Sequence, residues 1–206
     1  MRELLLIAIG ITTLLSCSDK ESLKSEKFVV HSSTSGNSYL YSIVNSKNDT
    51  ILKLDPEKYW VCFDDTVENF LVVAPKDKKG WWAIDFKENF LFQVYNTSEG
   101  EPSPDELNFN RIRIVDEAGK IGFADETGKV VITPAFEQAT AFNKDYAIIG
   151  ESCRKIPWDT THTEAGCNHY SIECARNGYI DKAGNVMDVG LYTLEELWDK
   201  LDFPER

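Results

Sequence analysis

Basic residues and histidines are scarce in this chain of 206 residues. Lysine and arginine number 22 against 34 acidic residues, the formal net charge is −12 at pH 7, and three histidines are present. A protein that binds nucleic acid needs a basic surface to neutralise phosphates, so we expect no nucleic-acid partner. The sequence also lacks a Gly-x-Ser-x-Gly elbow, a His-Glu-x-x-His motif and a glycine-rich phosphate loop. We therefore expect no catalytic residues and no cofactor.

The composition nevertheless predicts a folded protein. Hydrophobic residues make up 42% of the chain and aromatic residues 12%, which supplies ample apolar surface for a core and excludes intrinsic disorder. The length suits one domain, or a short array of repeats, rather than a multidomain enzyme.

The N-terminus predicts export and a lipid anchor. Residues 4–15 form an apolar run of about 18 Å as a helix, too short for a hydrocarbon core of about 30 Å. Such a run is typical of a secretory signal. The sequence Leu14-Leu15-Ser16-Cys17 resembles the bacterial lipobox. The resemblance implies removal of residues 1–16 and lipid attachment to Cys17, with two or more acyl chains for stable anchoring. The alternative is an ordinary signal peptide with an incidental cysteine.

Residues 17–27 are polar and charged, so we expect a flexible tether between the lipid and the domain. Aspartate directly after the lipidated cysteine favours inner-membrane retention in proteobacteria, and here that position holds Ser18. The resemblance therefore implies a protein of the bacterial cell envelope, anchored in the outer membrane.

An internal repeat organises the rest of the chain. Three five-residue segments share one design: 81–85 (WWAID), 121–125 (IGFAD) and 177–181 (NGYID). Asp85 and Asp125 are 40 residues apart, and a further step of 40 towards the N-terminus reaches 41–45 (YSIVN), a degenerate copy. Asp125 and Asp181 are 56 residues apart, which is one period plus sixteen inserted residues.

Each copy continues into a predicted turn. Glycine follows aspartate by three residues at Asp116, Asp125 and Asp181. This spacing suits a type I turn followed by a left-handed glycine, with aspartate accepting backbone hydrogen bonds rather than binding calcium. Apolar or β-branched runs at 70–73, 111–115, 130–132 and 147–149 predict strands, and Pro134 is expected to end the third of these. Each unit is therefore predicted to be a β-meander of two or three strands.

At these residues the sequence resembles the WG-repeat family. The best copy runs from Lys120 to Asp125 and continues through Pro134, Phe136 and Phe142, and the next spans 176–185. The resemblance covers residues 39–189, but the chain departs at several positions from the Trp-Gly pair that gives the family its name. Ile121 and Asn177 stand in place of tryptophan, whereas Trp82 and Ser42 stand in place of glycine. The resemblance implies a repeat fold found in bacterial envelope proteins and implies no reaction.

The predicted fold class is all-β, with about four units of roughly 40 residues stacked as an open array, because such units bury their apolar surface only against neighbours. The repeat domain covers 28–190, with units near 39–78, 79–118, 119–149 and 176–190 and an insertion at 150–175. Residues 191–206 carry a capping box from Thr193 to Glu196, which predicts a helix that covers the last unit.

The insertion concentrates the unusual chemistry of the chain. With Cys17 used for lipid, four thiols remain, at Cys62, Cys153, Cys167 and Cys174. In an exported protein these predict disulfides, and the most local option joins Cys153 to Cys167 or Cys174. One alternative is a zinc site, whose ligands would come from Cys153, Cys167 and Cys174 together with His162 and His169. No Cys-x-x-Cys pair, which most structural zinc sites use, is present.

A second alternative is an envelope hydrolase, in which Cys167 would be the nucleophile and His169 the base, with Glu164 nearby.

Tryptophans are the binding candidates. Trp82 lies at the repeat position that holds Ser42, Gly122 and Gly178 in the other copies. Its large ring therefore either packs on a neighbouring unit or stands exposed as a platform, which is a flat surface for a partner. Trp60, beside Tyr59, would extend that platform. Trp158 and His162 in the insertion are further candidates. We expect an unidentified protein or glycan partner.

Overall fold

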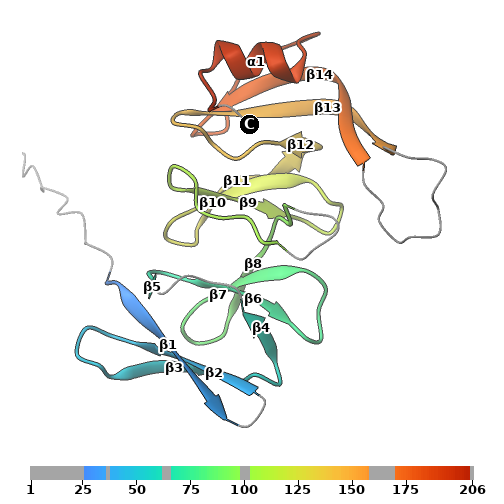
Figure 1. Ribbon diagram of the computed structural model, residues 1–206. Helices are drawn as coiled ribbons and strands as arrows, with labels where there is room; N and C mark the ends of the chain where they lie inside the picture. Colours follow the sequence, from blue (N-terminus) through green and yellow to red (C-terminus); the bar gives the residue numbers. More distant parts are fainter. Residues whose placement is uncertain (1–25, 36–37, 62–65, 98–102, 158–169, 205–206) are drawn as a thin grey trace, which may run out of the picture.

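A computed structural model describes residues 26–35, 38–61, 66–97, 103–157 and 170–204 of the chain (Figure 1). The apolar run at residues 4–15 and Cys17 lie outside these ranges, and so do Cys62, Trp158, His162, Cys167 and His169. The described residues form three open antiparallel sheets of four, seven and four strands and one short C-terminal helix. The all-β fold class with a terminal helix is confirmed.

Four three-stranded meanders make up the array, and we number them units 1 to 4. In each, the predicted repeat segment is the middle strand, paired with the strand before and the strand after it. The strands are β1 (Phe28–Ser35), β2 (Ser38–Val44) and β3 (Thr50–Leu54) in unit 1; β6 (Leu71–Pro75), β7 (Trp81–Ile84) and β8 (Phe90–Val94) in unit 2; β9 (Arg111–Val115), β10 (Ile121–Asp125) and β11 (Val130–Phe136) in unit 3; and β13 (Tyr146–Pro157), β14 (Tyr170–Asp181) and β15 (Val186–Gly190) in unit 4.

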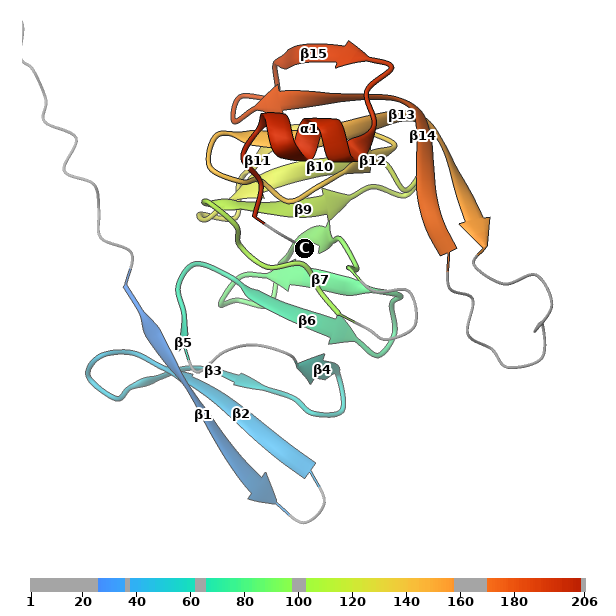
Figure 2. The same ribbon diagram turned by 45° about the horizontal axis from the view of Figure 1, so that its top comes forward.

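Three short strands add to the sheets, and units 2 and 3 are joined by a short stretch of strand pairing. β4 (Tyr59–Val61) pairs with β6, β5 (Thr66–Val67) with β1, and β12 (Gln138–Ala139) with β13. Units 2 and 3 share the seven-stranded sheet, which is held together between β8 and β9 by two residue pairs, Gln93↔Val115 and Val94↔Ile114. The units follow one another along the molecule, from β1–β3 at one end to β13–β15 at the other (Figures 1 and 2).

One apolar core lies between each pair of neighbouring units. The first joins Ile43 and Leu54 of unit 1 to Leu71 of unit 2. The second joins Trp81 of unit 2 to Ile112 of unit 3. The third joins Phe123 of unit 3 to Ile149 of unit 4. The units therefore bury their apolar side chains against each other, as the stacking argument predicted.

The same turn recurs in all four units, which confirms the turn prediction and the degenerate first copy. The Oδ1 atoms of Asn45, Asp85, Asp125 and Asp181 each accept hydrogen bonds from the backbone N–H groups two and four residues later. The residue three positions on is left-handed every time, with φ of 67° at Asn48, 60° at Glu88, 83° at Gly128 and 86° at Gly184. The strand register shifts at the same place in each copy, as expected for a bulged hairpin.

Acidification is expected to weaken folding through these turns. Hydrogen bonds from Asn89 hold the pKa of Asp85 below its ordinary value, and those from Asn185 do the same for Asp181. A carboxylate with a lowered folded-state pKa stabilises the fold fully above its unfolded pKa of about 3.9, and the contribution is lost as pH falls through the folded pKa. Urea midpoints should therefore decline on acidification from about pH 6 to about pH 2.5.

The variant Asp85→Asn isolates this effect, because asparagine keeps the acceptor oxygen, as Asn45 shows in unit 1, and does not titrate. We expect a shallower decline of the urea midpoint for this variant. A decline as steep as that of the unchanged chain would contradict the assignment.

The chain ends in helix α1 (Leu194–Lys200), which begins with the predicted capping box. The Thr193 side chain accepts from the Glu196 backbone, and the Glu196 side chain accepts from the Thr193 backbone. Leu197 is fully buried, and the helix contacts β13 and β14 of unit 4 (Figure 2). α1 is too short to cross a bilayer, and the described residues contain no long apolar helix.

Two expectations about strand ends were wrong. Pro134 does not end its strand, because β11 continues to Phe136 and pairs it with Ile121. Proline is accommodated there since β11 is the edge of its sheet and its register against β10 is shifted at this point. Residues 150–157 and 170–175, expected in an inserted loop, extend β13 and β14 instead.

Candidate functional site

An aromatic recess lies at the junction of units 1 and 2. It is lined by Tyr39, Tyr41, Tyr59 and Trp60 and has a volume of about 270 Å³. Trp60 is 65% exposed and Tyr39 is 62% exposed, which is unusual for side chains of this size. The rings of Tyr39 and Tyr41 are stacked with centroids 6.4 Å apart. Exposed rings around a recess suit contact with a sugar face or with an apolar side chain of a partner.

The local strand geometry explains this exposure. Trp60 lies on β4, an edge strand of the seven-stranded sheet, so among the described residues no strand pairs with its outer side. Alternation along the strand buries its neighbour Tyr59. Burial, with the nearby carboxylates of Glu88, Asp77 and Asp55, raises the pKa of Tyr59, so its phenol stays neutral. The ammonium of Lys76 lies 4.5 Å from the centroid of the Trp60 ring and also lines the recess. The recess therefore offers aromatic contacts together with charges of both signs, since Asp55 and Glu57 line it as well.

Trp82 is half-buried and lies elsewhere. Its Nε1–H donates to the Lys79 carbonyl at 3.1 Å, and its ring meets Phe90 edge-on at 5.5 Å. In the sheet, Trp60 is paired with Ala74 while Trp82 is paired with Val73. Directly paired residues share a face and successive residues alternate, so Trp60 and Trp82 lie on opposite faces. The expectation of one continuous platform was wrong.

The structure explains the glycine at the Trp82-equivalent position of units 3 and 4. A Cβ at Gly122 would lie 2.4 Å from the Ile132 carbonyl oxygen and 2.5 Å from the Pro134 nitrogen. A Cβ at Gly178 would lie 2.2 Å from the Asp188 carbonyl oxygen. In both units the next strand crosses the glycine directly, and this leaves no room for a side chain.

We expect Gly122→Ala to lower the free energy of unfolding by about 2–3 kcal/mol, because the clash is with backbone and no rotamer change relieves it. Gly119→Ala is the control. Gly119 has φ of 75° and nothing within 4 Å of the added Cβ, so its cost is the left-handed backbone alone, about 1 kcal/mol. Urea denaturation checks the order, and equal losses would contradict the steric argument.

A disulfide joins Cys153 to Cys174. These residues face each other across β13 and β14 at the base of a hairpin arm, residues 151–157 and 170–176, which extends beyond the stacked sheets (Figures 1 and 2). The Cys153 backbone N–H donates to Glu137 at 2.8 Å, and this hydrogen bond lowers the pKa of the Glu137 carboxyl. Farther out, the Lys155 ammonium lies 4.0 Å from the centroid of the Tyr170 ring. The arm is thus tied to the body at its base.

The disulfide bears on the zinc alternative. Cys153 and Cys174 are bonded to each other and supply no thiolate for a metal. Within the described ranges, no group of three or more histidine, cysteine, aspartate or glutamate side chains could hold a metal ion. His162, Cys167 and His169 lie outside those ranges, and so do Trp158 and Cys62, so the binding and hydrolase predictions on them stay predictions.

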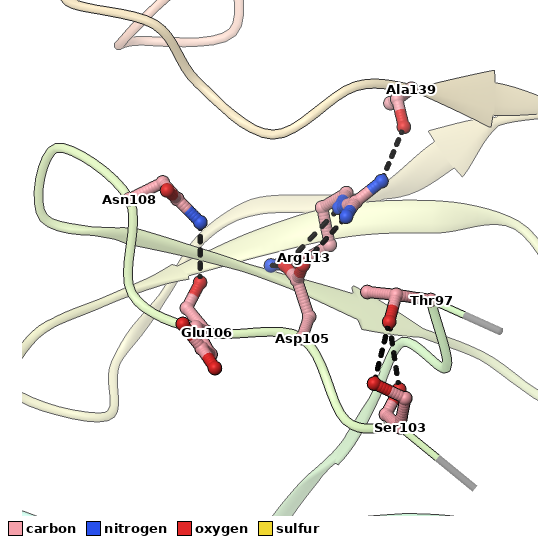
Figure 3. Close-up of polar contacts among 7 residues, drawn as sticks. All are labelled: Thr97, Ser103, Asp105, Glu106, Asn108, Arg113 and Ala139. Atoms are coloured by element: carbon pink, nitrogen blue, oxygen red, sulfur yellow. Dashed lines mark hydrogen bonds and ion pairs between the residues drawn. The ribbon is translucent and has the colours of Figure 1, made fainter. Parts of the chain in front are cut away.

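A buried ion pair joins Asp105, in the segment between β8 and β9, to Arg113 on β9, and the arginine also reaches β12 beside unit 4 (Figure 3). Asp105 is 4% exposed and accepts three hydrogen bonds from Arg113: from the backbone N–H at 2.8 Å, from Nε at 3.1 Å and from a terminal guanidinium nitrogen at 2.6 Å. The other terminal nitrogen donates to the Ala139 carbonyl at 3.2 Å, and the guanidinium lies 4.4 Å from the centroid of the Tyr95 ring. The pair positions the segment between β8 and β9.

Sequence reasoning missed Tyr39, Tyr41, Asp105 and Arg113. The alternation Tyr39-Leu40-Tyr41 was a usable signal, because it predicts two rings on one face of a strand. Arg113 lies between Ile112 and Ile114 on β9. Because the two isoleucines are buried on one face of the strand, the alternation places Arg113 on the opposite face. Nothing in the sequence near Asp105 identifies it as its partner.

The fold and the recess together define a stacked β-meander repeat protein with an aromatic recess near one end. Residues 121–150 match the family described as the WG containing repeat. The match runs from β10 of unit 3 into β13, and it takes in all but the first residue, Lys120, of the best copy of the repeat. No curated protein matches the chain.

Proposed function

We propose that this protein is a non-catalytic envelope lipoprotein that binds a protein or glycan partner on its repeat surface. The observation that carries the proposal is the aromatic recess, where the large rings of Tyr39 and Trp60 remain exposed side by side with a second tyrosine, Tyr41. Exposed aromatic residues are enriched where proteins meet partners. The apolar run at residues 4–15, followed by Cys17, supports an anchor at the outer membrane.

Site-specific photo-crosslinking tests the binding surface. A photo-reactive amino acid is placed at position 60, and in a second strain at position 191, where Leu191 is 89% exposed and remote from the recess. We expect adducts with an envelope protein or glycan from position 60 and none from position 191. The same pattern from both positions, or no adduct from position 60, would contradict the proposal.

Intact mass of the protein purified from its native membrane tests the anchor separately. We expect a chain that begins at Cys17 and carries acyl chains, and we expect Cys17→Ala to leave the membrane fraction. An unacylated chain would contradict the lipoprotein assignment and would leave the binding proposal standing.

A further inference from the structure

A second recess, distinct from the aromatic one, opens between units 2 and 3. It has a volume of about 500 Å³. Its apolar lining comes from Phe70 and Val72 in unit 2, Ile112 on β9, and Leu107 in the segment between β8 and β9. Leu107 is 47% exposed, so part of this apolar surface faces solvent. We call this recess the seam groove, because it follows the boundary between the two units.

The charges around the seam groove have one sign. Glu68, Glu106 and Glu126 line it, and none of its described lining residues is basic. Asp105 also lines the groove, but Arg113 neutralises it. Glu68 lies 3.4 Å from the Lys27 ammonium at the outer edge. The uncompensated charge therefore comes mainly from Glu106 and Glu126, in a chain whose net charge of −12 already attracts cations.

One carboxylate oxygen of Glu126, Oε2, is buried without a hydrogen-bond donor among the described residues. The backbone carbonyl of Glu126, by contrast, accepts a hydrogen bond from Asn69 at 2.8 Å, which fixes the residue at the boundary of units 2 and 3. Buried acceptors are normally paired, because an unpaired one forgoes the hydrogen bonds it had in water.

We infer that the seam groove binds a peptide segment in which an arginine or lysine side chain stands between apolar residues. The cationic head would donate to Glu126 and Glu106, and the flanking apolar side chains would cover Leu107 and Val72. Arginine suits the site best, because its planar group offers several donors at once to carboxylates. A bare divalent cation would leave the apolar lining uncovered. The inference goes beyond the proposed function and uses none of the residues of the aromatic recess.

Calorimetric titration of the full chain in neutral detergent micelles tests the inference. The probe is a blocked pentapeptide with one arginine flanked on each side by leucine, and its counterpart carries glutamine in place of arginine. We expect the arginine peptide to bind at least about tenfold more tightly than the glutamine peptide. Glu126→Gln should remove that preference. Glu117→Gln, which removes an exposed carboxylate outside the groove, should leave the preference unchanged.

Leu107→Ser provides a second variant, because an exposed residue is replaced without disturbing a core. It should weaken both peptides by a similar factor and keep the arginine preference. Trp60→Ala should not alter binding of either peptide, which separates this test from that of the aromatic recess. Equal binding of the two peptides, an unchanged preference in Glu126→Gln, or displacement of the peptide by millimolar calcium at one ion per chain would overturn the inference.

Discussion

Replacing Asp105 with alanine is expected to lower the free energy of unfolding by about 3–5 kcal/mol, the largest single effect we predict. The carboxylate accepts three hydrogen bonds from Arg113, and the Arg113 side chain is 13% exposed. Without its partner the guanidinium stays buried with its charge uncompensated. Removal of one member of a buried pair costs far more than the pair itself contributes, because the remaining ion has already lost its hydration.

Two further variants separate charge from packing. Asp105→Asn keeps the shape and one acceptor oxygen and should lose less than alanine. The double variant Asp105→Leu with Arg113→Met removes both charges and should recover most of the loss, because apolar replacement of a buried pair is often neutral. Urea unfolding followed by circular dichroism measures all three. A double variant as unstable as Asp105→Ala would show that the ion pair itself, rather than the unpaired charge, provides the stability.

The Asp105 variants also report on coupling between units. Arg113 belongs to β9 of unit 3, while the carbonyl it reaches belongs to Ala139 on β12, which pairs with unit 4. Loss of the pair should therefore loosen the boundary between units 3 and 4 before unit 1 is affected. Hydrogen exchange should accelerate first at β12, because stability in repeat arrays is carried largely by nearest-neighbour interfaces.

Features of the fold that depend on local chemistry were predictable from the sequence. The turn at Asp125 is formed by an aspartate and a left-handed glycine three residues later, and both are visible in the chain. The capping box at Thr193 is equally local. Stacking followed from the inability of one meander to bury its own apolar face. Even the degenerate first unit was predictable from the 40-residue spacing, and the structure shows that Asn45 accepts the same hydrogen bonds as the aspartates do.

Features that depend on register between distant strands were not predictable. Trp60 and Trp82 separate onto opposite faces because β4 and β7 pair with β6 one residue out of phase. A shift of one residue would have put both rings on one face. The seam groove likewise arises where two units meet, with Glu126 and Leu107 approaching from different segments. No local pattern in the chain encodes that meeting.

The Cys153–Cys174 pairing was one of the alternatives left open, because residues 153, 167 and 174 all lie within a short span. The structure selects Cys174 because β13 and β14 continue as a hairpin that brings the two residues face to face. The sequence of residues 150–175 predicted an inserted loop, so the extension of β13 and β14 into a hairpin was not expected.

Removing this disulfide with Cys153→Ser and Cys174→Ser is expected to lower the free energy of unfolding by about 3 kcal/mol, the chain-entropy cost of a loop of this length. Urea midpoints of the oxidised protein and the double variant should differ accordingly. Under reductant the two should converge, because the unchanged chain then also lacks the crosslink. A variant as stable as the oxidised protein would contradict the prediction.

The loss should be concentrated in the hairpin arm. Beyond the cysteines, the two strands are joined by backbone pairing from Arg154↔Glu173 to Pro157↔Tyr170, and side-chain contacts across them, of Arg154 with Glu173 and of Lys155 with Tyr170, are exposed. Exposed ion pairs contribute at most about 1 kcal/mol, and an isolated two-stranded hairpin is marginally stable in water. Hydrogen exchange in the variant should therefore rise most at residues 154–157 and 170–173. Residues 146–149, which pair with β14 over the core between units 3 and 4, should keep their protection because Ile149 and Ile180 remain buried there.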